Sequence, residues 1–142
     1  MPANTSPIFT LTPNVGTARI ATATTASDGS GAQQPLVLGG VNGTRVDAVR
    51  FRNSQIAASG STSMVHRIFY APTVATGSAT SRLVGEVATG NATRTPAAIG
   101  ATSIYVFDQP LIMASGSILH VCQSAYGGVQ DQFDAQAFAG DY

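Results

Sequence analysis

The sequence predicts an all-β fold, an antiparallel β-sandwich built from about nine short strands. Three observations lead to this prediction. No long window of the 142-residue chain repeats apolar residues at the helical spacing. Helix-favouring residues are scarce, because lysine is absent and Glu86 is the only glutamate. Short apolar runs recur instead between clusters of glycine, proline, asparagine, aspartate and serine, which is typical of strands and turns.

The first half of the chain contains five apolar runs of strand length. They cover residues 8–12, 18–23, 36–38, 45–51 and 64–70. A turn at residues 13–16 separates the first two. In the fourth run Val49 and Phe51 alternate with arginines, whereas Val46 falls on the opposite parity, which predicts a bulge or a buried second face. The fifth run is apolar on both parities, so we expect it to be a central strand.

The second half contains further runs of the same kind. They cover residues 82–87, 103–107, 111–113, 117–123 and 132–138. The polar triplet at residues 108–110 separates two of these runs, and a glycine turn at residues 114–116 precedes another. The last run places Phe133, Ala135 and Ala137 on one face, as expected for a half-buried strand.

The length of the chain predicts a single domain. We expect one sandwich domain over residues 14–142, preceded by an N-terminal arm or first strand over residues 1–13. No run of about 18 apolar residues occurs, and no basic segment followed by an apolar one opens the chain, so we expect neither a membrane span nor a secretory signal. The single cysteine, Cys122, excludes an internal disulfide.

Charge is scarce in this chain. Only 10% of the residues are charged, and seven arginines balance seven acids, whereas an ordinary domain is about 25% charged. A neutral surface favours a protein that packs against its own copies or a larger partner. Arginine is enriched at protein interfaces where lysine is depleted, although codon usage in a GC-rich genome produces the same preference. Arg45, Arg50 and Arg52 cluster on one expected strand, but Asp47 among them disfavours a nucleic-acid surface.

Candidate catalytic or metal-binding residues are few. His120 and Cys122 share a strand face, and with His66 they would suit a zinc site, or a thiol nucleophile with a histidine base. Packing of a small buried thiol and two histidines is the favoured interpretation. Asp131 and Asp134 lie three apart, which on a strand places them on opposite faces and disfavours a glycosidase acid pair. We therefore expect no enzyme activity, no metal, no cofactor and no small-molecule substrate.

Several segments together carry a resemblance to a known family. They are residues 4–9 (NTSPIF), 12–16 (TPNVG), 24–31 (TTASDGSG), 40–47 (GVNGTRVD), 67–69 (RIF) and 140–142 (GDY). They resemble small virion proteins of tailed bacteriophages, of the capsid decoration or cement type. Residues 110–121, an apolar strand, a glycine turn and a second apolar strand, also resemble the late hairpin of jelly-roll proteins. The fold that this implies is a jelly-roll-like sandwich.

The resemblance implies a structural virion protein with no active site. Such proteins are made in the host cytoplasm and sit on the outer capsid surface, often as homotrimers, where they clamp adjacent subunits of the major capsid protein. Neither nucleic acid nor membrane is an expected partner. The contact residues that we expect lie near the two ends of the chain. They are Pro7, Ile8, Phe9 and Leu11, followed by Phe138 and Tyr142.

Two other functions fit the same sequence. A phage tail, fibre or head–tail connector component would have the same composition. A host-glycan-binding module would need aromatic side chains on which a sugar can stack. The available tyrosines are Tyr70, Tyr105, Tyr126 and Tyr142, for most of which core or interface packing is the favoured role.

Overall fold

The described part of the computed structural model contains nine β-strands and no helix. It comprises residues 10–54, 63–73, 81–90, 100–125 and 132–142. The strands are β1 (Thr12–Asn14), β2 (Thr17–Ile20), β3 (Gln34–Leu38), β4 (Thr44–Asn53), β5 (Met64–Ala71), β6 (Arg82–Thr89), β7 (Thr102–Met113), β8 (Ile118–Gln123) and β9 (Phe133–Asp141). A search of these residues finds no helix long and apolar enough to cross a membrane. The all-β prediction is confirmed.

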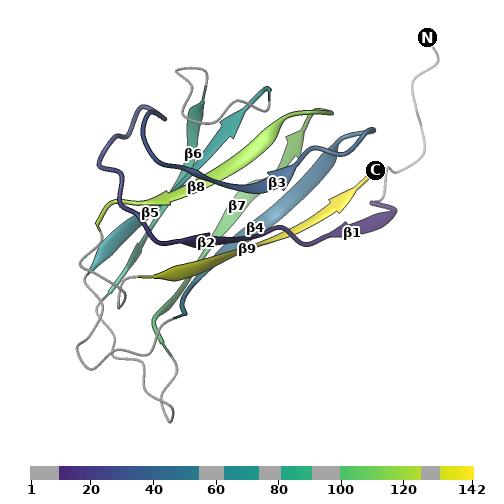
Figure 1. The fold of residues 1–142 in the computed structure, drawn as a ribbon. Helices are drawn as coiled ribbons and strands as arrows, with labels where there is room; N and C mark the ends of the chain where they lie inside the picture. The colour runs from purple at the N-terminus through teal and green to yellow at the C-terminus, as the bar shows by residue number, and fades with distance from the viewer. Residues whose placement is uncertain (1–9, 55–62, 74–80, 91–99, 126–131) are drawn as a thin grey trace, which may run out of the picture.

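The strands form two antiparallel sheets packed face to face (Figure 1). The larger has the order β9-β4-β7, with β1 and β2 both paired to the other side of β9, and the smaller has the order β3-β8-β5-β6. The pairs β2–β9, β3–β8, β4–β7 and β5–β6 are those of one antiparallel ribbon wound across two sheets. This is the strand order of a jelly roll.

The hydrophobic core lies between the two sheets. Its fully buried members come from both sheets and include Ile20, Val46, Val49, Phe51, Phe133, Ile68, Leu119 and Val121. Each such side chain contributes about 1.5–3 kcal/mol on burial. Phe133, Ala135 and Ala137 are all buried on one face of β9, so the alternation predicted for that strand is confirmed.

Two predictions about strand irregularity and position are also confirmed. The register of β4 shifts between Val46 and Ala48 against both β7 and β9, which is the bulge that the parity change predicts. Both Val46 and Val49 can then face the core. Strand β5 lies between β8 and β6, and both Ile68 and Phe69 are buried, as expected for a central strand.

The start of the chain differs from the prediction. The turn expected at residues 13–16 is replaced in part by β1, which pairs with the end of β9 through Pro13 and Gly140. An edge strand tolerates proline because its outer N–H groups have no partner in the sheet. Gly16 then leads into β2, and its carbonyl accepts a 2.9 Å hydrogen bond from the Ala137 amide. Residues 1–9 lie outside the described part, so the arm stays a prediction.

The two runs expected at residues 103–107 and 111–113 form one strand. Strand β7 continues through the polar triplet, and its register with β4 passes from Val106 to Leu111 at the bulge. The strand break predicted at residues 108–110 is therefore wrong, although residues 107–110 have no partner in the register with β4. The physical reason is that β7 is the edge of its sheet, where a residue without an N–H removes no ladder bond.

Candidate protein-binding face

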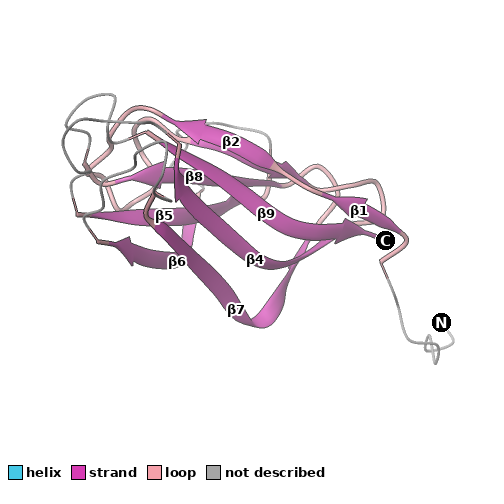
Figure 2. Ribbon diagram, turned by 90° about the horizontal axis from the view of Figure 1, so that it is seen from below, coloured by secondary structure: helices cyan, strands magenta, loops and turns pink. Residues whose placement is uncertain are grey.

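The outer face of the five-stranded sheet is the side that points away from the core. Directly paired residues of antiparallel strands project to the same face, so the register determines which side chains share it. Figure 2 shows β9, β4 and β7 side by side. Rows of paired residues cross these strands. One row holds Arg19, Asp134, Arg52 and Thr102, the next Thr17, Gln136, Arg50 and Ile104, and the next Phe138, Ala48 and Val106.

Exposed apolar side chains gather in the second and third of these rows. We call Ala48, Ile104, Val106 and Phe138 the apolar patch. Ile104 is 51% exposed, Val106 64% and Phe138 41%, and Ala48 lies between Phe138 and Val106 in the register. Single exposed apolar residues are normal on a folded domain, whereas these four share one face of the sheet, which makes that face the candidate contact surface.

Arg50 joins the apolar patch to a charged region. Its guanidinium carbon lies 5.7 Å from the centroid of the Phe138 ring, within the range of a cation–π interaction. The same guanidinium donates a hydrogen bond to the side-chain oxygen of Gln136. These two contacts hold the Arg50 side chain toward β9.

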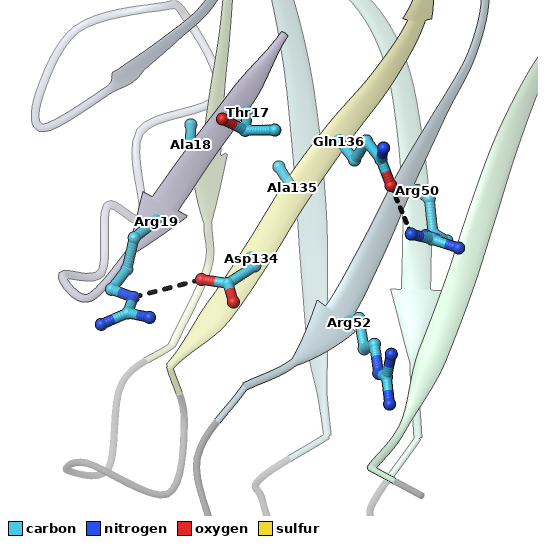
Figure 3. Close-up of a pocket in the computed structure, with 8 residues that line it drawn as sticks. All are labelled: Thr17, Ala18, Arg19, Arg50, Arg52, Asp134, Ala135 and Gln136. Atoms are coloured by element: carbon cyan, nitrogen blue, oxygen red, sulfur yellow. Dashed lines mark hydrogen bonds and ion pairs between the residues drawn. The ribbon is translucent and has the colours of Figure 1, made fainter. Parts of the chain in front are cut away.

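The charged region is a shallow groove on the same outer face, shown in Figure 3. It has a volume of about 680 Å³, and we call it the basic groove. Its lining comes from β2, β4 and β9 and consists of Thr17, Ala18, Arg19, Arg50, Arg52, Asp134, Ala135 and Gln136. Three arginines against one aspartate leave two positive charges on this lining, which favours an anionic group.

The structure places the expected contact residues as follows. Leu11 is 81% exposed, and its amide donates a 2.8 Å hydrogen bond to the carbonyl of Asp141. Phe138 belongs to the apolar patch. Tyr142 is half-buried, and its amide donates to the Gly43 carbonyl. Leu11 and Tyr142 thus both lie near the end of β9, whereas the residues of β9 that line the basic groove lie near its start. The other expected contacts, Pro7, Ile8 and Phe9, lie outside the described residues.

The three candidate zinc ligands do not converge. His66 faces the core and lies on the Phe51 ring at 4.5 Å between centroids. Its strand partner is Gln123, so Cys122 and His120 project to the opposite side of the sheet. Over the described ranges no group of three metal-ligating side chains occurs. The arrangement is that of two packed histidines and a buried thiol.

The remaining sequence candidates have other roles where the structure describes them. Tyr105 is partly buried, and its hydroxyl donates a 3.2 Å hydrogen bond to the Val84 carbonyl. Tyr70 packs against the core. Arg45 forms an ion pair with Asp47 at 2.8 Å. Unlike Arg50 and Arg52, it does not line the basic groove. Tyr126 and Asp131 lie outside the described part.

Sequence reasoning missed the position of Arg19 and the exposure of Ile104 and Val106. Arg19 lies more than thirty residues from Arg50 in the chain, and only the pairing of β2 and β4 with β9 brings the two strands to one face. The sequence does contain these apolar residues: Ile104 and Val106 lie on one parity of the expected strand, and Tyr105 and Phe107 lie on the other. Without knowing which parity faces the core, that pattern does not show which side chains are exposed.

The sandwich defines the protein as a jelly-roll domain. Comparison with protein-family models, curated proteins and solved structures found no match. Jelly rolls serve as viral capsid subunits, lectins and enzymes, so the fold alone does not assign a function.

Proposed function

We propose that this protein is a structural, non-enzymatic virion protein of a tailed bacteriophage, one that decorates the capsid. It binds the outer capsid surface as a homotrimer and clamps adjacent subunits of the major capsid protein. The segments quoted above supply the phage context through their resemblance to cement proteins. The observation that supports a binding role is the apolar patch, because it exposes several apolar side chains on one sheet face.

The energetics of decoration suit such a surface. Covering apolar area contributes about 25 cal/mol per Å², so a patch of a few side chains supports a modest contact. Many copies on one particle act together, and the combined effect is far larger than one contact. A net charge of zero also limits repulsion between densely packed copies.

Co-sedimentation with expanded, undecorated capsids tests this proposal. The wild-type protein is expected to pellet with capsids in a saturable manner. Val106→Ser removes an apolar side chain from the patch and should weaken binding by about tenfold, as loss of a buried valine would. Val41→Ser is the matched control, because Val41 is 89% exposed and lies outside the patch. Wild-type protein that stays in the supernatant would overturn the proposal.

Electron microscopy of the parent particle separates decoration from the tail alternative. Decoration predicts density over the whole capsid and a high copy number per virion. A tail, fibre or connector protein gives density along the tail or at one vertex. Light scattering of the purified protein tests the homotrimer separately.

A further inference from the structure

Of the three arginines that line the basic groove, one is paired with a carboxylate of the described residues. The Nε of Arg19 lies 3.1 Å from an oxygen of Asp134. Arg50 donates to the neutral side chain of Gln136. Arg52 is exposed and makes no hydrogen bond or ion pair with the described part of the chain, as Figure 3 shows for the groove. Two guanidinium groups of the groove therefore lack an acidic partner there.

The geometry of the sheet separates these charges. Asp134 stands directly opposite Arg52 in the β4–β9 register, yet its carboxylate turns to Arg19 on β2 (Figure 3). Arg50 and Arg52 lie two residues apart on β4 and project to the same face. The β4 side of the groove thus carries an exposed arginine, Arg52, and a partly buried one, Arg50, whose guanidinium lies over the ring of Phe138.

We propose that the basic groove binds a carboxylate side chain of an acidic, partly apolar segment of a partner protein. Arg52 and Arg50 donate hydrogen bonds to the carboxylate, and the apolar patch covers a neighbouring apolar side chain of the same segment. The proposal rests on the proposed function in taking a protein as the partner. It adds the chemistry by which that partner is recognised.

A carboxylate on a protein fits better than the phosphates of a nucleic acid. Guanidinium groups form bidentate hydrogen bonds with carboxylates and with phosphates alike, so the preference comes from the charge and the apolar surface around them. Nucleic-acid binding draws on many positive charges, whereas this chain is neutral overall and Asp134 lies within the groove. The apolar patch next to Arg50 also matches an apolar side chain better than a sugar–phosphate backbone.

A titration followed by nuclear magnetic resonance tests the groove without any capsid. The probe is the capped peptide acetyl-Leu-Glu-Leu-Glu-Leu-amide, with its glutamine counterpart as the matched neutral probe and inorganic phosphate as a separate arm. Ionic strength is held constant across the arms. The glutamate peptide is expected to shift the resonances of the groove and patch, including the side-chain Nε–H groups of Arg50 and Arg52, and the glutamine peptide to bind at least about tenfold more weakly.

Arginine variants assign the effect to the groove. Arg52→Gln should weaken binding of the glutamate peptide by about tenfold, as loss of a charge-assisted hydrogen bond would. Arg45→Gln is the control, because Arg45 lies on the same strand outside the groove. Equal binding of both peptides, equal loss in both variants, or shifts with phosphate alone would overturn the proposal. If the protein binds capsids but not the glutamate peptide, capsid decoration stands and the groove proposal fails. If it binds the peptide but not capsids, the groove proposal stands and capsid decoration fails.

Discussion

The imidazole of His66 lies flat on the ring of Phe51, with 4.5 Å between centroids and an angle of 8° between planes. Phe133 covers it from another side at 4.6 Å. Neither ring nitrogen of His66 makes a hydrogen bond within the described part of the chain. A histidine so enclosed is held as the neutral form, because an apolar site disfavours its charge.

This stacking predicts how stability depends on pH. Burial lowers the pKa of His66 from 6.5 to about 4. Between these values the unfolded chain binds a proton that the folded chain does not, so stability falls as pH drops from about 6.5 to about 4. The loss attributable to His66 is about 3 kcal/mol. Urea unfolding at several pH values should show it in the wild type and lack it in His66→Leu. An equal slope in the variant would contradict the prediction.

Gly85 should resist substitution because of its contact with the other sheet. A Cβ atom at Gly85 would stand 2.7 Å from two ring atoms of Tyr105. We expect Gly85→Ala to lower the free energy of unfolding by about 1–3 kcal/mol, the usual cost of overpacking. Gly90→Ala is the control, since a Cβ there meets no atom within 4 Å. Thermal unfolding of both variants measures the loss of stability. Equal losses in the two variants would contradict the predicted clash with Tyr105.

Asp141 ties the first and last strands of the larger sheet to β4. One oxygen of its side-chain carboxylate accepts a 2.5 Å hydrogen bond from the Thr44 hydroxyl and a 2.9 Å hydrogen bond from the side-chain amide of Asn14. Asp141→Ala leaves both donors without this acceptor and should cost about 1–3 kcal/mol. Amide hydrogen exchange at Leu11 should accelerate, because its amide donates to the Asp141 carbonyl.

Asp47→Ala is the control for that experiment. Its carboxylate pairs only with an exposed arginine of the same strand among the described contacts, so the expected cost is below about 1 kcal/mol. Equal loss of stability in the two variants would contradict a special role for Asp141.

Cys122 should be inert in the folded protein. It is buried, and burial raises the pKa of its thiol to about 11, although Arg67 nearby opposes the shift. Because the thiolate is the reactive form, a thiol reagent at neutral pH should not label the native chain. Mass spectrometry should show full labelling in denaturant. Rapid labelling of the folded protein would show that the thiol is accessible.

Removal of residues 1–7 tests the expected N-terminal contact. We expect the shortened chain to bind capsids more weakly and to keep its β-type circular dichroism spectrum, because the described strands begin at Thr12. Unchanged capsid binding would show that this segment makes no contact.

Local chemistry made much of the fold predictable. The alternation in Phe133, Ala135 and Ala137 depends only on the two-residue period of a strand, and all three are buried. The parity change at Val46 likewise predicts the bulge that the register shows. The break expected at residues 108–110 was wrong, because whether a strand tolerates a proline such as Pro110 depends on the place of that strand in the sheet. Strand order reveals that β7 is an edge.

The candidate site was much less predictable. Phe138 was expected as a contact residue and lies in the apolar patch, while Pro7, Ile8 and Phe9 fall outside the described residues. The basic groove was not expected, because Arg19 and Arg52 become neighbours only through β9, which lies between their strands. Pairs so distant in sequence leave no local pattern.

The sequence by itself determined the all-β class, the approximate position of most strands, the net charge of zero and the use of arginine for every basic residue. These properties follow from composition and from periodicity along a few residues. Only the tertiary structure decided which strand faces were covered. Residues 104–107 have apolar or aromatic side chains on both parities, and the packing of one sheet on the other places Tyr105 inward and leaves Ile104 and Val106 exposed.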